Sequence, residues 1–311
     1  MGMSMADGLS YPKLAQVAPR PVSAYSQMLF ATMLFGLGNV AQKSLFDDIG
    51  MWSALGLRGL IAAMALLPFA MLEMQRLSHT KISTLRHAPA VMVTFAAAIT
   101  CQQIGAGYTS ATNLGFLINA SVVFTPVILW LAGKSGLPRF IWPSCALCFV
   151  GAGLMAGSSV SAFGFGDIMC LVAAVFYALW MIQLEKLMAD VDAPATIAFA
   201  QWLLPALGGL AAGAVLETTP STAIASALPE LLFLGTLASG LGYMMAAKAQ
   251  SRMPACIAAI CYPLEAIFGA GFAYLLLSEH LSLTGIAGAT LIFASILLVQ
   301  WGCRSKAQSV G

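Results

Sequence analysis

Two ionisable side chains lie deep inside long apolar runs: Arg58 in "LGLRGLIAA" and Glu265 in "CYPLEAIFGAGFAY". A charge inside hydrocarbon costs about 2.5–3.5 kcal/mol on insertion scales, so each needs a physical reason. The first reason is structural: the two charges pair and offset each other's desolvation. The second is functional: Glu265 faces a water-filled cavity and binds a substrate ammonium group or a proton. The third is that Glu265 is protonated, because burial disfavours the charged form of a carboxyl group.

Other polar and aromatic side chains in the apolar runs could line the same cavity. Tyrosine and tryptophan rings offer their faces to aromatic or cationic ligands, and amides offer both donors and acceptors. The alternative for many of them is a hydrogen bond between two helices. For Trp180 it is a ring anchored at the membrane surface. The candidate substrate-binding residues are Glu265, Tyr262, Asn39, Gln42, Asn113, Tyr177, Trp180, Gln201 and Tyr243.

The composition places these residues in a bilayer. Of the 311 residues, 60% are hydrophobic and 8% are charged, and the mean hydropathy is +0.88; soluble domains carry roughly 25% charged residues. Each apolar segment is long enough to cross about 30 Å of hydrocarbon as a helix. We therefore expect an all-α polytopic membrane protein with ten transmembrane helices. The segments lie at approximately 24–45, 50–72, 88–107, 110–132, 138–157, 166–187, 193–216, 227–247, 253–277 and 283–302.

The basic residues predict the orientation of these spans. If the N-terminus is cytoplasmic, twelve of the 14 Lys and Arg residues lie on the inner side of the membrane. The opposite orientation would place the same twelve outside. Because positive charge resists translocation, we expect the N and C termini to be cytoplasmic.

The sequence contains an internal repeat at an offset of about 143 residues. Residues 31–58 align with residues 174–201, and this alignment places Lys43 on Lys186. The alternative is the general likeness of any two hydrophobic helices. A repeat of five spans is odd in number, so the two copies are inverted relative to each other, as in many secondary transporters. The expected units are an N-terminal tail at 1–23, repeats at 24–157 and 158–302, and a C-terminal tail at 303–311.

Two prolines fall in equivalent helices of the two repeats. Pro126 and Pro263 remove backbone hydrogen bonds inside their spans, so we expect a kink near each. Equivalent kinks favour a role in gating. Together with Arg58, these prolines are the predicted structural or coupling residues.

Several other functions are disfavoured. "AGKSG" at 132–136 lacks the earlier glycine of a phosphate-binding loop, because Ile128 takes its place. The histidines lie in loops without a metal-binding pattern, so we expect no enzyme, catalytic residue, metal or cofactor. A net charge of +2 is too small to imply a nucleic-acid partner. An intramembrane enzyme and a non-transporting membrane scaffold are the alternatives; the oligomeric state is unknown.

Several short motifs resemble those of EamA-type transporters in the drug/metabolite transporter superfamily. The likeness covers residues 26–302. "FGLGNVAQKSLF" is similar to the family's Trp-Gly…Lys segment, with Phe35 in place of the tryptophan. "LEAIFGAGFAYLLLSEHLSLTGIAG" is similar to the family's Leu-Glu-Pro…Gly-Glu segment, with Ala266 in place of the proline.

The resemblance implies a secondary, non-ATP transporter of the bacterial inner (plasma) membrane that works by alternating access. Among such transporters, the sequence is most similar to bacterial exporters of amino acids, including bulky or aromatic ones. The span interior carries one base and one acid, so a zwitterionic or neutral solute fits better than a phosphorylated one. Drug-like cations and other neutral metabolites are the alternative substrates. The expected partners are a small-molecule substrate and the lipid bilayer; proton exchange and facilitated diffusion both stay open.

Overall fold

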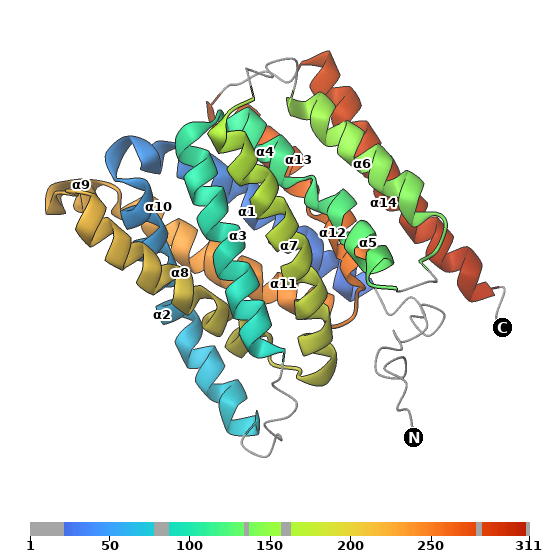
Figure 1. Ribbon diagram of the computed structural model, residues 1–311, viewed down its shortest axis with the longest axis horizontal. Coiled ribbons are helices and arrows are strands. Elements are labelled where there is room, and N and C mark those ends of the chain that lie inside the picture. The colour runs from blue at the N-terminus through green and yellow to red at the C-terminus, as the bar shows by residue number, and fades with distance from the viewer. Residues whose placement is uncertain (1–21, 78–86, 134–136, 157–162, 278–281, 309–311) are drawn as a thin grey trace.

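In the described part of the chain, all regular structure is helical (Figure 1). The expected N-terminal tail lies almost entirely outside this part, as do Glu279, the second acid of the family-like segment "LEAIFGAGFAYLLLSEHLSLTGIAG", and the side chain of Lys43. The computed structural model describes residues 22–77, 87–133, 137–156, 163–277 and 282–308.

Within the described residues, ten helical segments build the bundle, in agreement with the predicted fold class. Eight of them are long and apolar enough to cross a membrane. The other two are α1, with 27 residues, and α6, a shorter apolar helix of 16 residues. The short helix α9 (Ser221–Ser226) joins two segments. The segments are α1 (Val22–Asp48), α2 (Met51–Leu77), α3 (Ala88–Tyr108), α4 (Ala111–Ile118) with α5 (Ser121–Leu131), α6 (Ile141–Ala156), α7 (Phe165–Asp190), α8 (Pro194–Leu216), α10 (Leu228–Phe233) with the π-helix η3 (Leu234–Gly242) and α11 (Tyr243–Gln250), α12 (Ala255–Cys261) with α13 (Leu264–Leu277), and α14 (Leu283–Gln308).

Two of the predicted spans are broken near their middle. In the first half α4 ends at Ile118 and α5 begins at Ser121. In the second half α12 ends at Cys261 and α13 begins at Leu264. Each second-half boundary comes 143 residues after its first-half counterpart, which is the offset of the predicted repeat. The same irregularity therefore recurs at the equivalent place in both copies.

The two breaks have different local causes. At the second, Pro263 lacks a backbone N–H and interrupts the helix, as predicted. At the first, the break between Ile118 and Ser121 comes before the proline, and Pro126 lies inside α5. The side-chain amide of Asn119 donates to the carbonyl oxygen of Gly115 at 2.7 Å and so competes with the backbone hydrogen bonds of the helix.

The helices of the two halves pack in a two-fold pattern. α2 packs along its equivalent α8, and α6 along its equivalent α14. These two pairs lie at opposite edges of the bundle (Figure 1). α3 packs on α7, and the equivalent contact joins η3 and α11 to α1. α1 packs on α13, as α7 does on α5. The contacts that a helix makes are thus repeated by the equivalent helix of the other half, which is the packing of inverted repeats.

Reciprocal carboxylate caps join α2 to α8. Glu217, directly after α8, accepts a hydrogen bond from the Ser53 backbone N–H at 2.8 Å, at the beginning of α2. Glu73, near the end of α2, accepts one from the Thr196 backbone N–H at 2.8 Å, at the beginning of α8. Carboxylates at helix N-termini satisfy unpaired N–H groups and complement the helix dipole. Because each helix caps the other, α2 and α8 run antiparallel.

Candidate functional site

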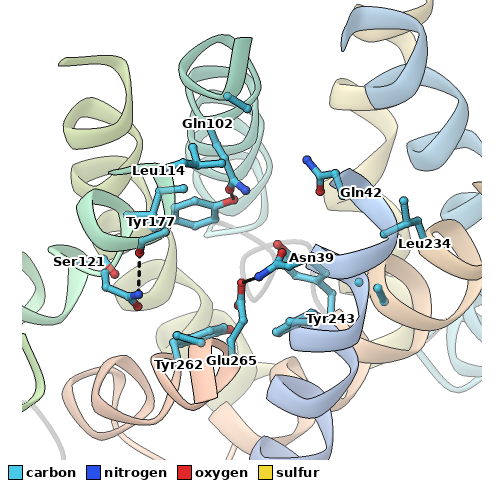
Figure 2. Close-up of a pocket in the computed structure, with 18 of the residues that line it drawn as sticks. Asn39, Gln42, Gln102, Leu114, Ser121, Tyr177, Leu234, Tyr243, Tyr262 and Glu265 are labelled. Atoms are coloured by element: carbon cyan, nitrogen blue, oxygen red, sulfur yellow. Dashed lines mark hydrogen bonds between the residues drawn. The ribbon is translucent and has the colours of Figure 1, made fainter. Parts of the chain in front are cut away.

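Both halves contribute to the walls of a central cavity of about 280 Å³ (Figure 2). This volume is near the lower end of the ~300–1,000 Å³ range of small-molecule sites. The walls come from α1, α2, α3, α4 and α5 of the first half and from α7, η3, α11 and α13 of the second. A small solute could therefore contact both repeats at once.

The acid and the base both line this cavity, and each is hydrogen-bonded to an amide of α1. Glu265 Oε1 accepts a hydrogen bond from Asn39 Nδ2 at 2.7 Å. Arg58 Nη1 donates to Gln42 Oε1 at 2.8 Å, and Arg58 Nε donates to Ser239 Oγ at 2.7 Å. The sequence analysis considered a direct ion pair between Arg58 and Glu265. In the structure, two amides of α1 bind these side chains instead: Asn39 binds Glu265, and Gln42 binds Arg58. We call this pair the α1 amides.

A close approach of α1 to α13 positions the first of these amides. A methyl group added at Gly36 would lie 2.6 Å from the Gly269 backbone nitrogen and 2.7 Å from the Glu265 carbonyl oxygen. No side chain other than hydrogen fits there. Asn39 lies three residues further along the same helix face. Figure 2 shows its side chain pointing toward the carboxylate of Glu265.

Arg58 is buried, and neutral side chains hold its guanidinium. Only 8% of the residue is exposed, and its guanidinium lies 5.1 Å from the centroid of the Trp202 ring, within range of a cation–π interaction. Trp202 Nε1 donates to the carbonyl oxygen of Ser239 at 3.0 Å, which fixes the ring. The hydrogen-bond partners of Arg58 among the described residues, Gln42 and Ser239, are uncharged.

Aromatic rings form much of the remaining wall. The ring centroid of Tyr243 lies 4.8 Å from that of Phe35 and 5.9 Å from that of Trp180. Tyr262 stacks parallel to Phe35, with its centroid 6.2 Å away. The Tyr262 hydroxyl is buried and has no hydrogen-bond partner among the described residues. The Tyr177 hydroxyl donates a hydrogen bond to Gln102 Oε1. The wall thus combines apolar ring surface with phenolic groups.

The predicted site residues divide into two groups. Asn113 and Gln201 are not part of the cavity wall: Asn113 Nδ2 donates to Asp167 Oδ1 at 3.1 Å, and Gln201 Oε1 accepts from Trp180 Nε1 at 3.0 Å. Both amides join helices. Trp180 is only 1% exposed, so it is not a surface anchor. The cavity wall includes Glu265, Tyr262, Asn39, Gln42, Tyr177, Trp180, Tyr243 and Arg58.

Sequence reasoning overlooked two residues of the site. Ser239 holds Arg58 but carries no local signal, since it reaches the base only because η3 packs on α2. Ser121 begins α5 and lines the cavity at the break in its span. The equivalence of the two breaks could have indicated Ser121: Tyr262 at the second break is a candidate, so a polar residue at the first break could be expected to line the cavity as well.

The first-half wall of the cavity lies nearer to one end of the bundle. The lining residues of the first half belong to the C-terminal half of α1, the beginning of α2, the end of α3, and α4 with the first residue of α5. These helix ends meet on one side of the bundle (Figure 1). Toward the other side, the buried ring of Phe95 contacts Trp202 and Tyr243 edge to face, at centroid distances of 5.1 Å. Phe95 and Trp202 lie in the first halves of α3 and α8, and both rings are fully buried.

The comparisons with known proteins agree with this architecture. An uncharacterised transporter of Archaeoglobus fulgidus is 30% identical over 201 residues, which are 64% of this chain and 64% of that relative. The chain thus matches less than two thirds of the relative's length. A crystal structure of a protein that is 12% identical has the same fold, with a TM-score of 0.76 over 91% of this chain and 98% of its own.

The family assignment comes from two separate matches. The EamA-like transporter family matches residues 22–157 and again residues 164–301, once in each half. The two matches together cover most of the chain, and in the part that the structure describes eight helices are long and apolar enough to span a bilayer. The chain is a multi-pass membrane protein, and it belongs to the EamA-like transporter family.

Proposed function

We propose that the protein is a secondary transporter that exports amino acids, including bulky and aromatic ones, across the bacterial inner membrane by alternating access. The observation that carries the proposal is the cavity between the inverted halves, whose wall holds one acid, one base and several aromatic rings. The proposal places both termini in the cytoplasm and the repeats at 24–157 and 158–302.

The charges of the cavity wall support a zwitterionic substrate. Glu265 offers a carboxylate to an ammonium group, and Arg58 offers a guanidinium to a carboxylate. A phosphorylated solute would require more than one base. An organic cation would be repelled by Arg58. The tyrosine and tryptophan rings suit an aromatic or otherwise bulky side chain, and a cavity of about 280 Å³ limits the solute to a small metabolite.

The repeat supports alternating access. Two lining residues, Asn39 and Arg58, have counterparts 143 residues later that are buried: Ile182 for Asn39 and Gln201 for Arg58. The buried Gln201 Nε2 has no hydrogen-bond partner in the described ranges, so closure of that side leaves a polar atom unsatisfied. If the halves exchange their packings, these counterparts line a second cavity.

Cysteine labelling tests this exchange. Cys261 is 2% exposed and is the counterpart of Ile118, which lines the cavity. An impermeant maleimide should modify Cys261 from the cytoplasmic face of vesicles, and an introduced Ile118→Cys from the outer face, as read by peptide mass spectrometry. Cys256 is the internal control: it is buried, but its counterpart Asn113 is not in the cavity wall, so it should stay unmodified.

A second variant makes the labelling test decisive. Phe95→Ala removes the ring that closes the cytoplasmic path, and it should increase the labelling of Cys261 severalfold. Labelling of Cys261 from the outer face, or none in either protein, would argue against alternating access between these two cavities.

Transport assays test the substrate and the role of Glu265. Purified protein in liposomes should carry labelled phenylalanine in a saturable manner, while liposomes without protein should not. Glu265→Gln keeps the shape of the side chain and can still hydrogen-bond to Asn39, but it removes the negative charge. We expect it to lower phenylalanine flux roughly tenfold or more, because a charge-assisted hydrogen bond is worth about 1.5–3 kcal/mol.

Two outcomes would count against these claims. Absence of saturable flux for every amino acid tested would remove the substrate proposal. Unchanged flux and unchanged pH dependence in Glu265→Gln would show that Glu265 is neither an essential ligand nor a proton site.

A further inference from the structure

We infer that Gln42 determines substrate specificity: its neutral amide reserves Arg58 for a substrate carboxylate, and so restricts transport to solutes that carry both a carboxylate and an ammonium group. This inference rests on the proposed function and deepens it. It assigns the selection to the residue that touches the base, rather than to the base itself.

The first step is the state of Arg58 in the empty cavity. Its Nη1 donates to Gln42 Oε1 at 2.8 Å and its Nε to Ser239 Oγ at 2.7 Å, both neutral acceptors. The guanidinium lies over the Trp202 ring and is buried except for 8% of the residue. A cation desolvated in this way gains more from a carboxylate than from an amide oxygen, because hydrogen bonds between opposite charges are the stronger ones.

The second step is the separation of the acid from the base. Glu265 bonds to Asn39, and Arg58 bonds to Gln42, which lies three residues further along α1. Residues at this spacing lie on the same face of a helix, about 5–6 Å apart at their Cβ atoms. The α1 amides thus present a donor to the acid and an acceptor to the base. They occupy the positions that an ammonium group and a carboxylate of one small solute would take.

The third step is a comparison within the chain itself. The counterpart of Gln42 in the second repeat is Glu185, and the counterpart of Arg58 is Gln201. Glu185 Oε2 accepts a hydrogen bond from the Ala255 backbone N–H at 2.9 Å, where it caps α12. The second repeat has an acid, Glu185, at the position of Gln42 but no base at the position of Arg58. The first repeat has the base together with a neutral amide, so the residue at position 42 does not neutralise Arg58.

A negative charge at position 42 should therefore change the selection. In Gln42→Glu, the new carboxylate would pair with Arg58 and repel a substrate carboxylate. Glu265 would stay available to an ammonium group. The variant should then accept amines that lack a carboxylate and reject the zwitterion.

The experiment compares two probes with the same aromatic ring in liposomes that contain the full chain. Phenylalanine carries both charged groups, and 2-phenylethylamine carries only the ammonium group. We expect the wild type to transport phenylalanine at least tenfold faster than the amine. In Gln42→Glu this ratio should fall below one, with the amine flux increased in absolute terms.

A matched variant separates selection from a structural role. Gln42→Met has a similar length and no charge, so it should keep the wild-type preference even if both fluxes decrease. Inversion in Gln42→Glu together with retention in Gln42→Met would support the inference. An equal loss of both fluxes in Gln42→Glu, or the same shift in Gln42→Met, would overturn it. Absence of phenylalanine flux in the wild type would instead overturn the proposed function.

Discussion

Gly36→Ala is expected to lower transport at least tenfold and to destabilise the protein. The added methyl group would lie 2.6 Å from the Gly269 nitrogen, 2.7 Å from the Glu265 carbonyl oxygen and 2.8 Å from Phe268 Cβ. Two of these are backbone atoms that cannot rotate away, so α1 and α13 must separate. Overpacking of this kind costs about 1–3 kcal/mol. The separation also draws Asn39 away from the acid. Flux in liposomes and the thermal unfolding midpoint measure the two effects.

Gly271→Ala is the matched control for this prediction. Gly271 lies on α13, two residues after Gly269, and nothing lies within 4 Å of a methyl group built on it. This variant should keep wild-type flux and stability. Wild-type behaviour of Gly36→Ala, or an equal loss in both variants, would show that the contact between α1 and α13 does not set the geometry of the cavity.

Arg58→Leu is expected to lower phenylalanine flux roughly a hundredfold. The change removes the charge that would bind the substrate carboxylate and leaves the acceptors on Gln42 and Ser239 without their donor. It also removes the cation over the Trp202 ring. A charge-assisted hydrogen bond is worth about 1.5–3 kcal/mol, so the loss of the substrate contacts at this base gives an effect of that order. Initial rates over a range of phenylalanine concentrations measure it.

Arg58→Lys distinguishes charge from geometry. Lysine keeps the positive charge but cannot donate to Gln42 and Ser239 from one planar group. It should therefore give a flux between those of the wild type and Arg58→Leu. If Arg58→Leu transports phenylalanine at the wild-type rate while the protein stays folded, the base serves only to hold helices together.

Both predictions depend on the same helix. α1 contacts α13 through Gly36, and through the α1 amides it bonds to Glu265 on α13 and to Arg58 on α2. A substrate that replaced the amide contacts would change how α1 is held against two helices of opposite halves. In the proposed transport cycle, this gives a physical route from occupation of the site to movement of the repeats.

The spans and their inverted arrangement could be predicted from the sequence because each follows from a local pattern. The length of an apolar run decides whether a helix can cross the bilayer. The offset of 143 residues reappears in the helix boundaries on both sides of the two breaks. Such features need no knowledge of which helices are neighbours. The polar candidates were found for the same reason, since a polar group in hydrocarbon is costly wherever its helix lies.

The tertiary structure alone decided which candidates share a cavity. In a soluble helix, the apolar face identifies the core, but a membrane helix is apolar on the lipid side as well. The depth of Arg58 and Glu265 in the bilayer could therefore be predicted from local sequence, but the direction in which their side chains point could not. Whether they pair depends on where α1 passes, and α1 passes between them with an amide for each. Gln201 looked equally suitable, yet its side chain is turned to Trp180. Rotation about the helix axis is set by packing between distant segments, and no local pattern in this chain encodes it.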